Sequence, residues 1–243
     1  MPPMITLFPS RFARIALRRP PLLAGLAVLF ASLIAGCTSP PTNDVSRVGP
    51  FYVPRNVHGD PTLGGVRRVL LMPIWAGELV PDESAADLDP VFRQALQDQN
   101  RFEVVTMARD ECRRRFGATA LSSTQALPHD LIATVQRLYA ADAIMFVDLT
   151  TFRPYRPIAI GIRARLVIVN NLHFAWSFDN LFSVDDPEVA ASARHFFVNS
   201  MRQEVPGDLT PAVLQSPSRF AAYAANATFL TLPPVTLAKI PSR

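Results

Sequence analysis

The fold is decided by one short stretch, Ala143-Ile144-Met145-Phe146-Val147, in which apolar residues follow one another without a break. A continuous apolar run of this kind is typical of a β-strand that is buried on both of its faces. Asp148 follows directly and is expected to close the strand. We therefore expect a central strand that other elements cover from both sides.

Upstream of this run, strand and helix patterns alternate. Arg67–Ile74 holds a second apolar run behind two arginines, and Phe102–Val105 is a short third one. Asp89 is expected to be the N-cap of a helix between them, with Pro90 at the first helical position. Apolar residues recur there at the spacing of one helix face: Leu88, Val91, Phe92, Ala95 and Leu96.

The segment that leads to Ala143 predicts two more helical pieces. Ala108–Phe116 is polar and rich in arginine, which indicates a helical turn on the surface. A Ser/Thr loop follows at Ser122–Gln125. The next helix is amphipathic, and its inward residues are expected to be Leu131, Val135, Leu138 and Tyr139.

Downstream of Asp148 the pattern becomes that of a β-hairpin. Ile160–Val169 alternates between apolar and other residues, which predicts a strand with one dry and one wet face at its start. Asn170-Asn171 suits a tight turn, because asparagine tolerates positive φ. Leu172–Phe182 is expected to return as the partner strand. Its aromatic residues are expected on one side, with Trp176 in the core: Phe174, Trp176 and Phe178.

Two helical patterns complete the domain and settle its class. Asp186-Pro187 opens one helix and Ser216-Pro217 opens the other, which Leu232-Pro233-Pro234 stops. The predicted order is β-α-β-α-β-β-β-α-α. The fold class is therefore α/β (α+β), a layered mixed β-sheet of about five strands with amphipathic helices packed on it.

The first residues have the pattern of an export signal. Arginines precede an apolar segment at Leu22–Ile34, and no acidic residue occurs before Cys37. The apolar segment has about 13 residues, well short of the ~20 that a transmembrane helix needs. We therefore expect the segment to be cleaved off.

The stretch Ile34, Ala35, Gly36 and Cys37 resembles the lipobox of bacterial lipoproteins. The resemblance implies cleavage before Cys37, and covalent diacylglycerol and N-acyl lipid on its thiol and amine, which would anchor the mature chain in membrane lipid. Thr38 stands where the inner-membrane retention signal has Asp, which favours the outer membrane, facing the periplasm. The alternative is an ordinary signal peptide or anchor that happens to end in a cysteine. No further cofactor is expected.

These patterns divide the chain into four parts. Residues 1–36 are the expected signal peptide, and residues 37–65 hold the lipidated cysteine and a proline-rich tether. Residues 66–234 form a single α/β domain, and residues 235–243 a C-terminal tail. Within the tether, Phe51-Tyr52-Val53 is an apolar patch that is expected to dock on the domain or on a partner.

The net charge of +4 belongs to the signal peptide. Four of the 24 Lys and Arg residues lie in it, so the mature chain has 20 basic and 20 acidic residues. This balance gives no support for binding nucleic acid. With Cys37 lipidated, Cys112 is the only cysteine left, and it cannot form an internal disulfide.

Several loose motifs within residues 66–182 resemble a periplasmic module. They are an apolar strand that ends at Pro73, the stretch Arg101–Val105, the triplet Ala141-Asp142-Ala143 and a hairpin whose return strand carries Trp176. The module is shared by the curli-secretion lipoprotein CsgG, the penicillin-binding-protein activator LpoB and the TolB amino-terminal domain. The resemblance implies contact with other envelope proteins and no chemistry.

The sequence departs from two members of this group. Thr150–Ile158 is too short and too rich in proline to be the membrane hairpin of a CsgG-like pore. No propeller follows the module, as one does in TolB. We therefore expect neither a pore nor the role of TolB.

The best candidate for a binding site is Arg153-Pro154-Tyr155-Arg156-Pro157. Arginine and tyrosine dominate binding hot spots, and prolines hold a loop in shape before contact. Trp75, at the exit of the first strand, could join Arg153, Tyr155 and Arg156 in this patch. The alternative is a plain connector with solvated arginines. The expected partner is an envelope protein, and the sequence leaves the oligomeric state open.

Few residues suggest chemistry. Three arginines follow Cys112 and could lower the pKa of its thiol, but acidic residues precede it and no histidine has a context that pairs with it. The four histidines are scattered without ligand spacing, so no metal site is predicted. Asp186 is interpreted as an N-cap rather than as part of a calcium loop.

Three functions follow from these observations. We expect a non-catalytic lipoprotein whose domain binds another component of the cell envelope. The alternative is a subunit of an oligomeric export or assembly ring related to curli secretion. The third hypothesis is a thiol-dependent envelope enzyme that uses Cys112.

Overall fold

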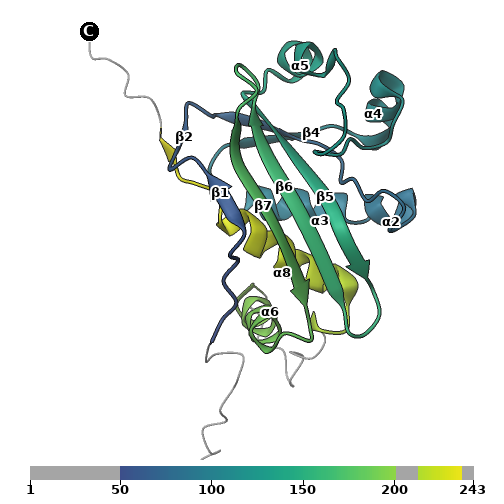
Figure 1. Ribbon diagram of the computed structural model, residues 1–243, viewed down its shortest axis with the longest axis vertical. Coiled ribbons are helices and arrows are strands. Elements are labelled where there is room, and N and C mark those ends of the chain that lie inside the picture. The colour runs from purple at the N-terminus through teal and green to yellow at the C-terminus, as the bar shows by residue number, and fades with distance from the viewer. Residues whose placement is uncertain (1–49, 201–212, 237–243) are drawn as a thin grey trace, which may run out of the picture. The chain divides into compact units, whose positions relative to one another are not determined.

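The predicted α/β class is confirmed by a mixed sheet with helices packed on it (Figure 1). The computed structural model describes residues 50–200 and 213–236. The expected signal peptide and lipobox, with Cys37, lie outside the described residues. The main sheet has six strands, one more than the sequence predicts.

The parallel part of the sheet comes from the three apolar runs. β3 (Arg68–Leu71) lies between β4 (Glu103–Thr106) and β5 (Ala143–Arg153) and is parallel to both. Ala143 to Val147 are all buried, as expected of a strand that is covered on both faces. β5 continues well beyond Asp148, so the prediction that this aspartate closes the strand is wrong.

The antiparallel part is the predicted hairpin with one added strand. β6 (Ala159–Ile168) pairs with β5, β7 (Phe174–Ser183) pairs with β6, and β1 (Val57–Gly59) pairs with β7. The strand order is β1-β7-β6-β5-β3-β4. β1 lies within the segment expected to be the tether. The sequence did not predict this strand, because three residues are too few to show a period.

One face of the sheet, which we call the inner face, carries the larger core. α3 (Asp89–Gln97), α6 (Pro187–Ser200) and α8 (Pro217–Leu230) cover it. Trp176 is 1% exposed, which confirms its predicted place in the core. Its ring lies 6.5 Å from that of Phe229 on α8. Aromatic residues of β7 and α8 thus join the helices to the sheet.

The opposite face, the outer face, is covered mainly at one end. α4 (Arg109–Phe116), α5 (Leu131–Thr134) and the following π-helical turn Val135–Tyr139 pack there on residues of β3 and β5 such as Leu70 and Phe146. On β7, Phe174 and Leu181 are about half exposed, at 52% and 51%. The hairpin strands therefore keep part of their outer face open.

The apolar patch before β1 docks on the domain. Tyr52 N donates to Ser192 Oγ on α6 at 2.8 Å, and the Tyr52 ring meets Phe182 edge-on at 5.6 Å between centroids. The Phe51 ring lies 4.6 Å from that of His195. Docking on the domain, one of the two predicted roles of this patch, is thus confirmed for these two residues.

A small second sheet joins the two ends of the described chain. β2 (Leu63–Gly64) pairs in parallel with β8 (Val235–Thr236). Leu63 N also donates to Pro234 O at 2.8 Å. The segment after the last helix is therefore held against the segment before the first parallel strand.

Two of the three predicted N-caps are confirmed and one is wrong. Asp186 Oδ1 accepts from Glu188 N at 2.8 Å, and Ser216 Oγ accepts from Arg219 N at 3.5 Å. Asp89 is the first residue of α3 rather than its N-cap, which is Leu88. Its carboxylate instead accepts from Ile74 N and from Arg109, so it is not available to the helix terminus.

Three residues differ from what the sequence pattern predicts, two in the place of the side chain and one in the backbone. Leu138, expected inward, is 44% exposed, because the π-helical turn departs from the period of 3.6 residues. The positive φ of the hairpin turn falls on Leu172, at 55°, and not on the asparagines. Phe174 does not lie on the same side of β7 as Trp176 and Phe178. The reason is that the register of β6 and β7 shifts between the pair Leu166–Trp176 and the pair Val167–Phe174.

Within residues 50–200 and 213–236, none of the helices has the length and apolar character needed to cross a membrane.

Candidate functional site

The binding loop predicted from the sequence forms the tip of the β5–β6 hairpin. Arg153 is the last residue of β5, and the chain crosses to β6 through residues 154–158. Tyr155 exposes 84% of its surface, and Arg153 and Arg156 are exposed too. The peptide bond between Arg156 and Pro157 is cis. We call residues 153–157 the hairpin tip.

A paired ladder carries the hairpin tip. β5 and β6 remain in register up to the pair Arg153 and Ala159, and Ile158 and Ala159 are fully buried at the base of the tip. The tip therefore projects from a rigid support, although it has no ladder of its own.

A hollow of about 400 Å³ lies beside the hairpin tip. Phe152 and Pro154 line it from the hairpin, and Pro217 lines it from the start of α8. The remaining wall comes from the segment around α2 (Asp82–Ala86), with Leu79 and Val80 before the helix and Asp87 after it. Leu79 is 47% exposed at the rim. Three segments far apart in sequence thus form one largely apolar hollow.

Exposed charged residues lie on two of the segments that form this hollow. Asp87 lines the hollow on the α2 side, one helical turn after Glu83, while Arg153 and Arg156 belong to the hairpin tip and are not among the lining residues. All four side chains are exposed. None of the four has an ion-pair partner within the described residues. The lining of the hollow therefore has one acidic residue, Asp87, among mainly apolar side chains.

Trp75 has different surroundings from the hairpin tip. Its backbone joins the sheet beside β5, where Trp75 N donates to Val147 O at 3.0 Å and Leu149 N donates to Trp75 O at 2.8 Å. Its indole packs on Gly77, where an added Cβ would lie 2.9 Å from the ring. Trp75 lines a second hollow, of about 390 Å³, together with Arg113. The two hollows share no lining residue.

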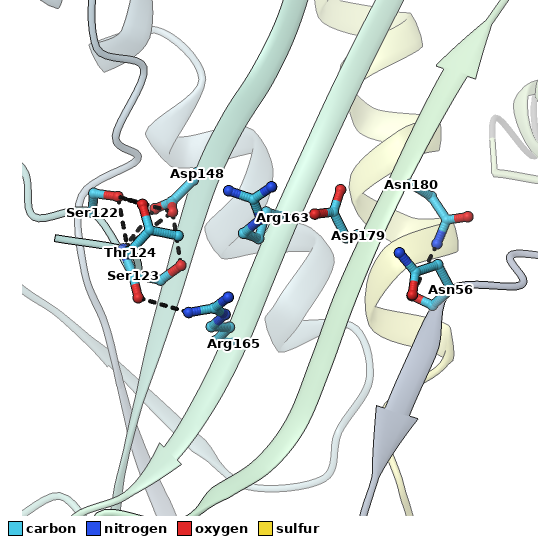
Figure 2. A network of polar contacts seen from close by, with 9 residues as sticks. All are labelled: Asn56, Ser122, Ser123, Thr124, Asp148, Arg163, Arg165, Asp179 and Asn180. Carbon is cyan, nitrogen blue, oxygen red and sulfur yellow. Dashed lines mark hydrogen bonds and ion pairs between the residues drawn. The ribbon is translucent and has the colours of Figure 1, made fainter.

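Sequence reasoning missed a polar network on the outer face of the sheet, which Figure 2 shows. Asp148 is only 1% exposed. Its carboxylate accepts hydrogen bonds from Ser123 Oγ at 2.7 Å, from Ser123 N at 3.1 Å and from Ser122 Oγ at 3.1 Å. The predicted Ser/Thr loop therefore folds over the middle of β5 and holds a buried carboxylate.

Burial raises the pKa of Asp148. Loss of hydration is the largest cause, while the hydrogen bonds from Ser123 and Ser122 and the charge of Arg163 act in the opposite direction. The folded protein therefore binds a proton at this carboxyl more readily than the unfolded chain does.

The network continues across the hairpin strands. Arg163 stands opposite both Asp148 and Asp179 in the sheet register, and its Nε lies 2.8 Å from Asp179 Oδ2. Arg165 Nη1 donates to Ser123 O at 2.9 Å, and its guanidinium lies over the Phe174 ring, 5.4 Å from the centroid. These side chains come from three neighbouring strands (Figure 2). The contacts fasten the Ser/Thr loop to the sheet, so we assign the network a structural role.

The low thiol pKa considered for Cys112 is wrong. The residue is fully buried inside α4. Burial is the main reason that the pKa of its thiol rises to about 11, and the nearby charge of Glu111 adds to the rise. Arg109 lowers the pKa but does not offset burial. The thiol of Cys112 is therefore neither accessible nor ionised at neutral pH.

The described residues bring together no set of metal ligands. Nowhere in residues 50–200 and 213–236 do three or more His, Cys, Asp or Glu side chains gather so that they could hold an ion. His173 Nε2 lies 3.0 Å from the carboxylate of Asp60, which ties the turn of the hairpin to the chain after β1.

Comparison with known proteins gives a likeness in fold alone. No family model matches the chain, and no curated protein sequence matches it. Among solved structures, LpoB of E. coli is similar over 74% of this chain and 82% of its own, with 15% identity and a TM-score of 0.36. LpoB, one member of the group named from the sequence motifs, is thus among the structures to which this chain is similar.

Two further structures are similar to a comparable degree. The PelC dodecamer from Paraburkholderia phytofirmans matches over 71% of this chain and 96% of its own, with 11% identity and a TM-score of 0.38. Lipoprotein GNA1162 from Neisseria meningitidis matches over 48% of this chain and 79% of its own, with 14% identity and a TM-score of 0.35. Because these TM-scores are below 0.5, the likeness carries no conclusion about what the chain does.

Proposed function

We propose that this chain is a lipid-anchored protein of the bacterial cell envelope whose α/β domain binds another protein and catalyses no reaction. The stretch that ends in Cys37 supports the anchor, since it follows an arginine-bearing, apolar leader and resembles a lipobox. Thr38, in place of the Asp of inner-membrane retention, supports the outer membrane and a domain that faces the periplasm.

The hairpin tip is the observation that carries the binding function. Tyr155 exposes 84% of its surface between two arginines that have no ion-pair partner within the described residues. A tyrosine so exposed on a rigid hairpin contributes nothing to the core of its own domain. Arg and Tyr at a preformed surface are the residue types that supply most of the energy of a protein interface.

The state of Cys112 supports a protein without catalysis. A thiol that is fully buried and has its pKa raised to about 11 supplies neither access nor thiolate for a nucleophilic reaction. Cys112 is the residue for which the sequence gives the strongest argument for a catalytic role. Binding therefore explains the exposed residues better than an enzymatic role does.

Photo-crosslinking in living cells tests this function. A photoreactive amino acid replaces Tyr155 in the full-length protein, and a second strain carries it in place of Leu138, which is also exposed but lies on the π-helical turn. We expect position 155 to give reproducible protein adducts that position 138 does not give. An Arg153→Ala/Arg156→Ala change should weaken those adducts. Absence of any adduct specific to position 155 would contradict the proposal.

A further inference from the structure

The described chain enters the domain at the end of the sheet that carries the hairpin tip. Tyr52 packs edge-on against Phe182 of β7. Phe182 lies beside Ile160 of β6, and Ile160 lies beside Phe152 of β5, the residue before the tip. Phe182 and Phe152 are thus two strand spacings apart, about 10 Å. Figure 1 shows the start of the described chain and the turn between β5 and β6 at the same end of the sheet.

The opposite end of the sheet is far from this entry point. β6 has ten residues, and at about 3.3 Å per residue it extends for about 33 Å. The π-helical turn lies at the far end, where its Val135 belongs to the same buried cluster as Val169, just after β6. A tether that ends at Phe51 therefore keeps the hairpin tip, on average, nearer to the anchoring surface than the far end.

The tether is short compared with the domain. In the proposed function the lipid is on Cys37, and residues 38–50 separate it from Phe51. A flexible chain of about 13 residues spans about 20 Å on average, and about 45 Å when fully extended. The hairpin tip should therefore face the bilayer across a gap that is narrower than a domain of about 100 residues, which is about 30 Å across.

We propose that the partner of the hairpin tip is a protein embedded in the same bilayer as the lipid anchor. The inference rests on the proposed function and its anchor, because it names the class of protein that the tip binds. A protein embedded in the bilayer presents its surface inside the gap, whereas a soluble protein has to enter the gap from the side. Confinement of both proteins to one bilayer also raises their effective concentration.

The surroundings of the tip favour a protein surface over the lipid itself. Arg153 and Arg156 suit the phosphates of lipid headgroups, and Tyr155 suits the bilayer interface. The hollow of about 400 Å³ beside them does not, because it is lined mainly by apolar side chains and carries the acidic Asp87. A layer of phosphates repels this carboxylate and offers no fixed apolar group to fill the hollow. The surface of a folded protein supplies both an acidic group for the arginines and an apolar group for the hollow.

Photo-crosslinking with an altered tether tests the inference. The photoreactive amino acid stands at position 155 of the full-length, lipidated protein. One variant has about 100 Gly and Ser residues inserted between Asn43 and Asp44, and a matched control has the same segment added after Arg243. Both changes lie outside the described residues. Mass spectrometry identifies the adducts, and carbonate extraction of membranes that lack the photoreactive protein shows whether the captured protein is embedded in the bilayer.

We expect position 155 to capture a protein that stays in the membrane after carbonate extraction. The layer in which the tip moves thickens with the square root of tether length, from about 20 Å to about 60 Å in the variant. The concentration of the tip near the bilayer falls about threefold, and the yield of the adduct should fall by the same factor. The control should give the original yield. A soluble partner predicts an equal or higher yield with the longer tether, because the gap opens.

The outcome also separates this inference from the proposed function. A captured protein that carbonate extracts would overturn the membrane partner, as would a yield that the longer tether leaves unchanged or raises. In both cases the tip still binds a protein, so the binding function stands. If position 155 gives no protein adduct, or an adduct with phospholipid alone, both proposals fail.

Discussion

Cys112 has three arginines directly after it in the sequence, and yet burial decides the state of its thiol. These three arginines are exposed on α4, and Arg113 and Arg115 are paired with Asp110 and Glu111. The thiol points into the core instead, together with Leu70. A cation in the next position of a helix therefore does not stabilise a thiolate that lacks water.

The reactivity of Cys112 gives the first prediction. With the pKa raised to about 11, alkylation by iodoacetamide at pH 8 should be at least about a hundredfold slower in the folded protein than in urea. Mass spectrometry of timed samples measures the rate, in a Cys37→Ser background so that one thiol reports. Equal rates in the two states would show that the thiol is accessible.

Asp148 gives the second prediction, on pH. Because burial raises its pKa in the folded state, its contribution to stability is fully present below the unfolded pKa, about 3.9, and is lost as pH rises through the folded pKa. We expect the free energy of unfolding of the unchanged protein to fall relative to that of Asp148→Asn from about pH 4 to pH 7. Urea titrations at four pH values measure it. A difference that stays constant with pH would contradict this.

At the scale of elements, a charge pair joins the first parallel strand to two helices. Arg109 Nε at the start of α4 lies 2.6 Å from Asp89 Oδ2 at the start of α3. Ile74, which follows β3, donates its N–H to Asp89 at 3.0 Å, and its carbonyl accepts from Arg109 Nη2 at 2.8 Å. The Arg109 side chain is 12% exposed, so little water replaces a lost partner.

The third prediction concerns this pair. Asp89→Ala should lower the free energy of unfolding by about 3 kcal/mol, because it leaves the largely buried Arg109 charge with only the longer contact to Asp82, at 4.0 Å. Arg109→Ala should have an effect of similar size, and the double variant should lose less than the sum, with a coupling of about 1–3 kcal/mol. Denaturant titrations of the four proteins measure the cycle. Strict additivity would mean that the pair contributes nothing of its own.

β1 gives the fourth prediction. An added Cβ on Gly59 would lie 2.8 Å from Ala175 O and 3.1 Å from Trp176 Cα, and the backbone of β7 cannot move aside. We expect Gly59→Ala to separate β1 from β7 and to lower the free energy of unfolding by about 1–3 kcal/mol. Gly64→Ala, where the added Cβ meets nothing within 4 Å, is the control. Similar stability of the two variants would show that β1 contributes little.

Local patterns predicted the elements that have a period or a cap of their own. The runs at β3 and β5, the alternation of β6, and the caps Asp186 and Ser216 are all read within a few residues. What failed depends on distant partners. β1 exists because β7 offers an edge, and Asp89 leaves the cap position because Arg109 reaches it from α4.

The candidate site also has a part that the sequence could indicate and a part that it could not. The local sequence indicated the hairpin tip as a candidate, since its arginines, prolines and Tyr155 are consecutive. The hollow beside the tip was out of reach, because its walls come from residues near 80, 152 and 217. The network at Asp148 was missed because Ser122 and Ser123 meet it only when the loop folds back on the sheet.

At the scale of the whole molecule, the proposed lipid anchor gives the fifth prediction. Cys37→Ser should abolish lipidation, because the proposed site then lacks the thiol that takes the diacylglyceryl group, and the protein should no longer stay with the membrane fraction. Intact-mass analysis and membrane fractionation measure the two effects. Cys112→Ser, which removes the other cysteine, should leave both unchanged. An unmodified Cys37 in the original protein would overturn the anchor and the envelope location.

The docking of Phe51 and Tyr52 bears on how the domain would withstand a mechanical load. If the lipid holds one end of the chain while a bound protein is dragged away, tension enters the domain through Phe51 and Tyr52. The contacts of Tyr52 with Ser192 and Phe182 would give way before the three-residue strand β1, and β1 before the long ladder of β5, β6 and β7. The segment between the lipid and the domain would thus lengthen in steps, while the hairpin tip, the proposed binding site, kept its shape.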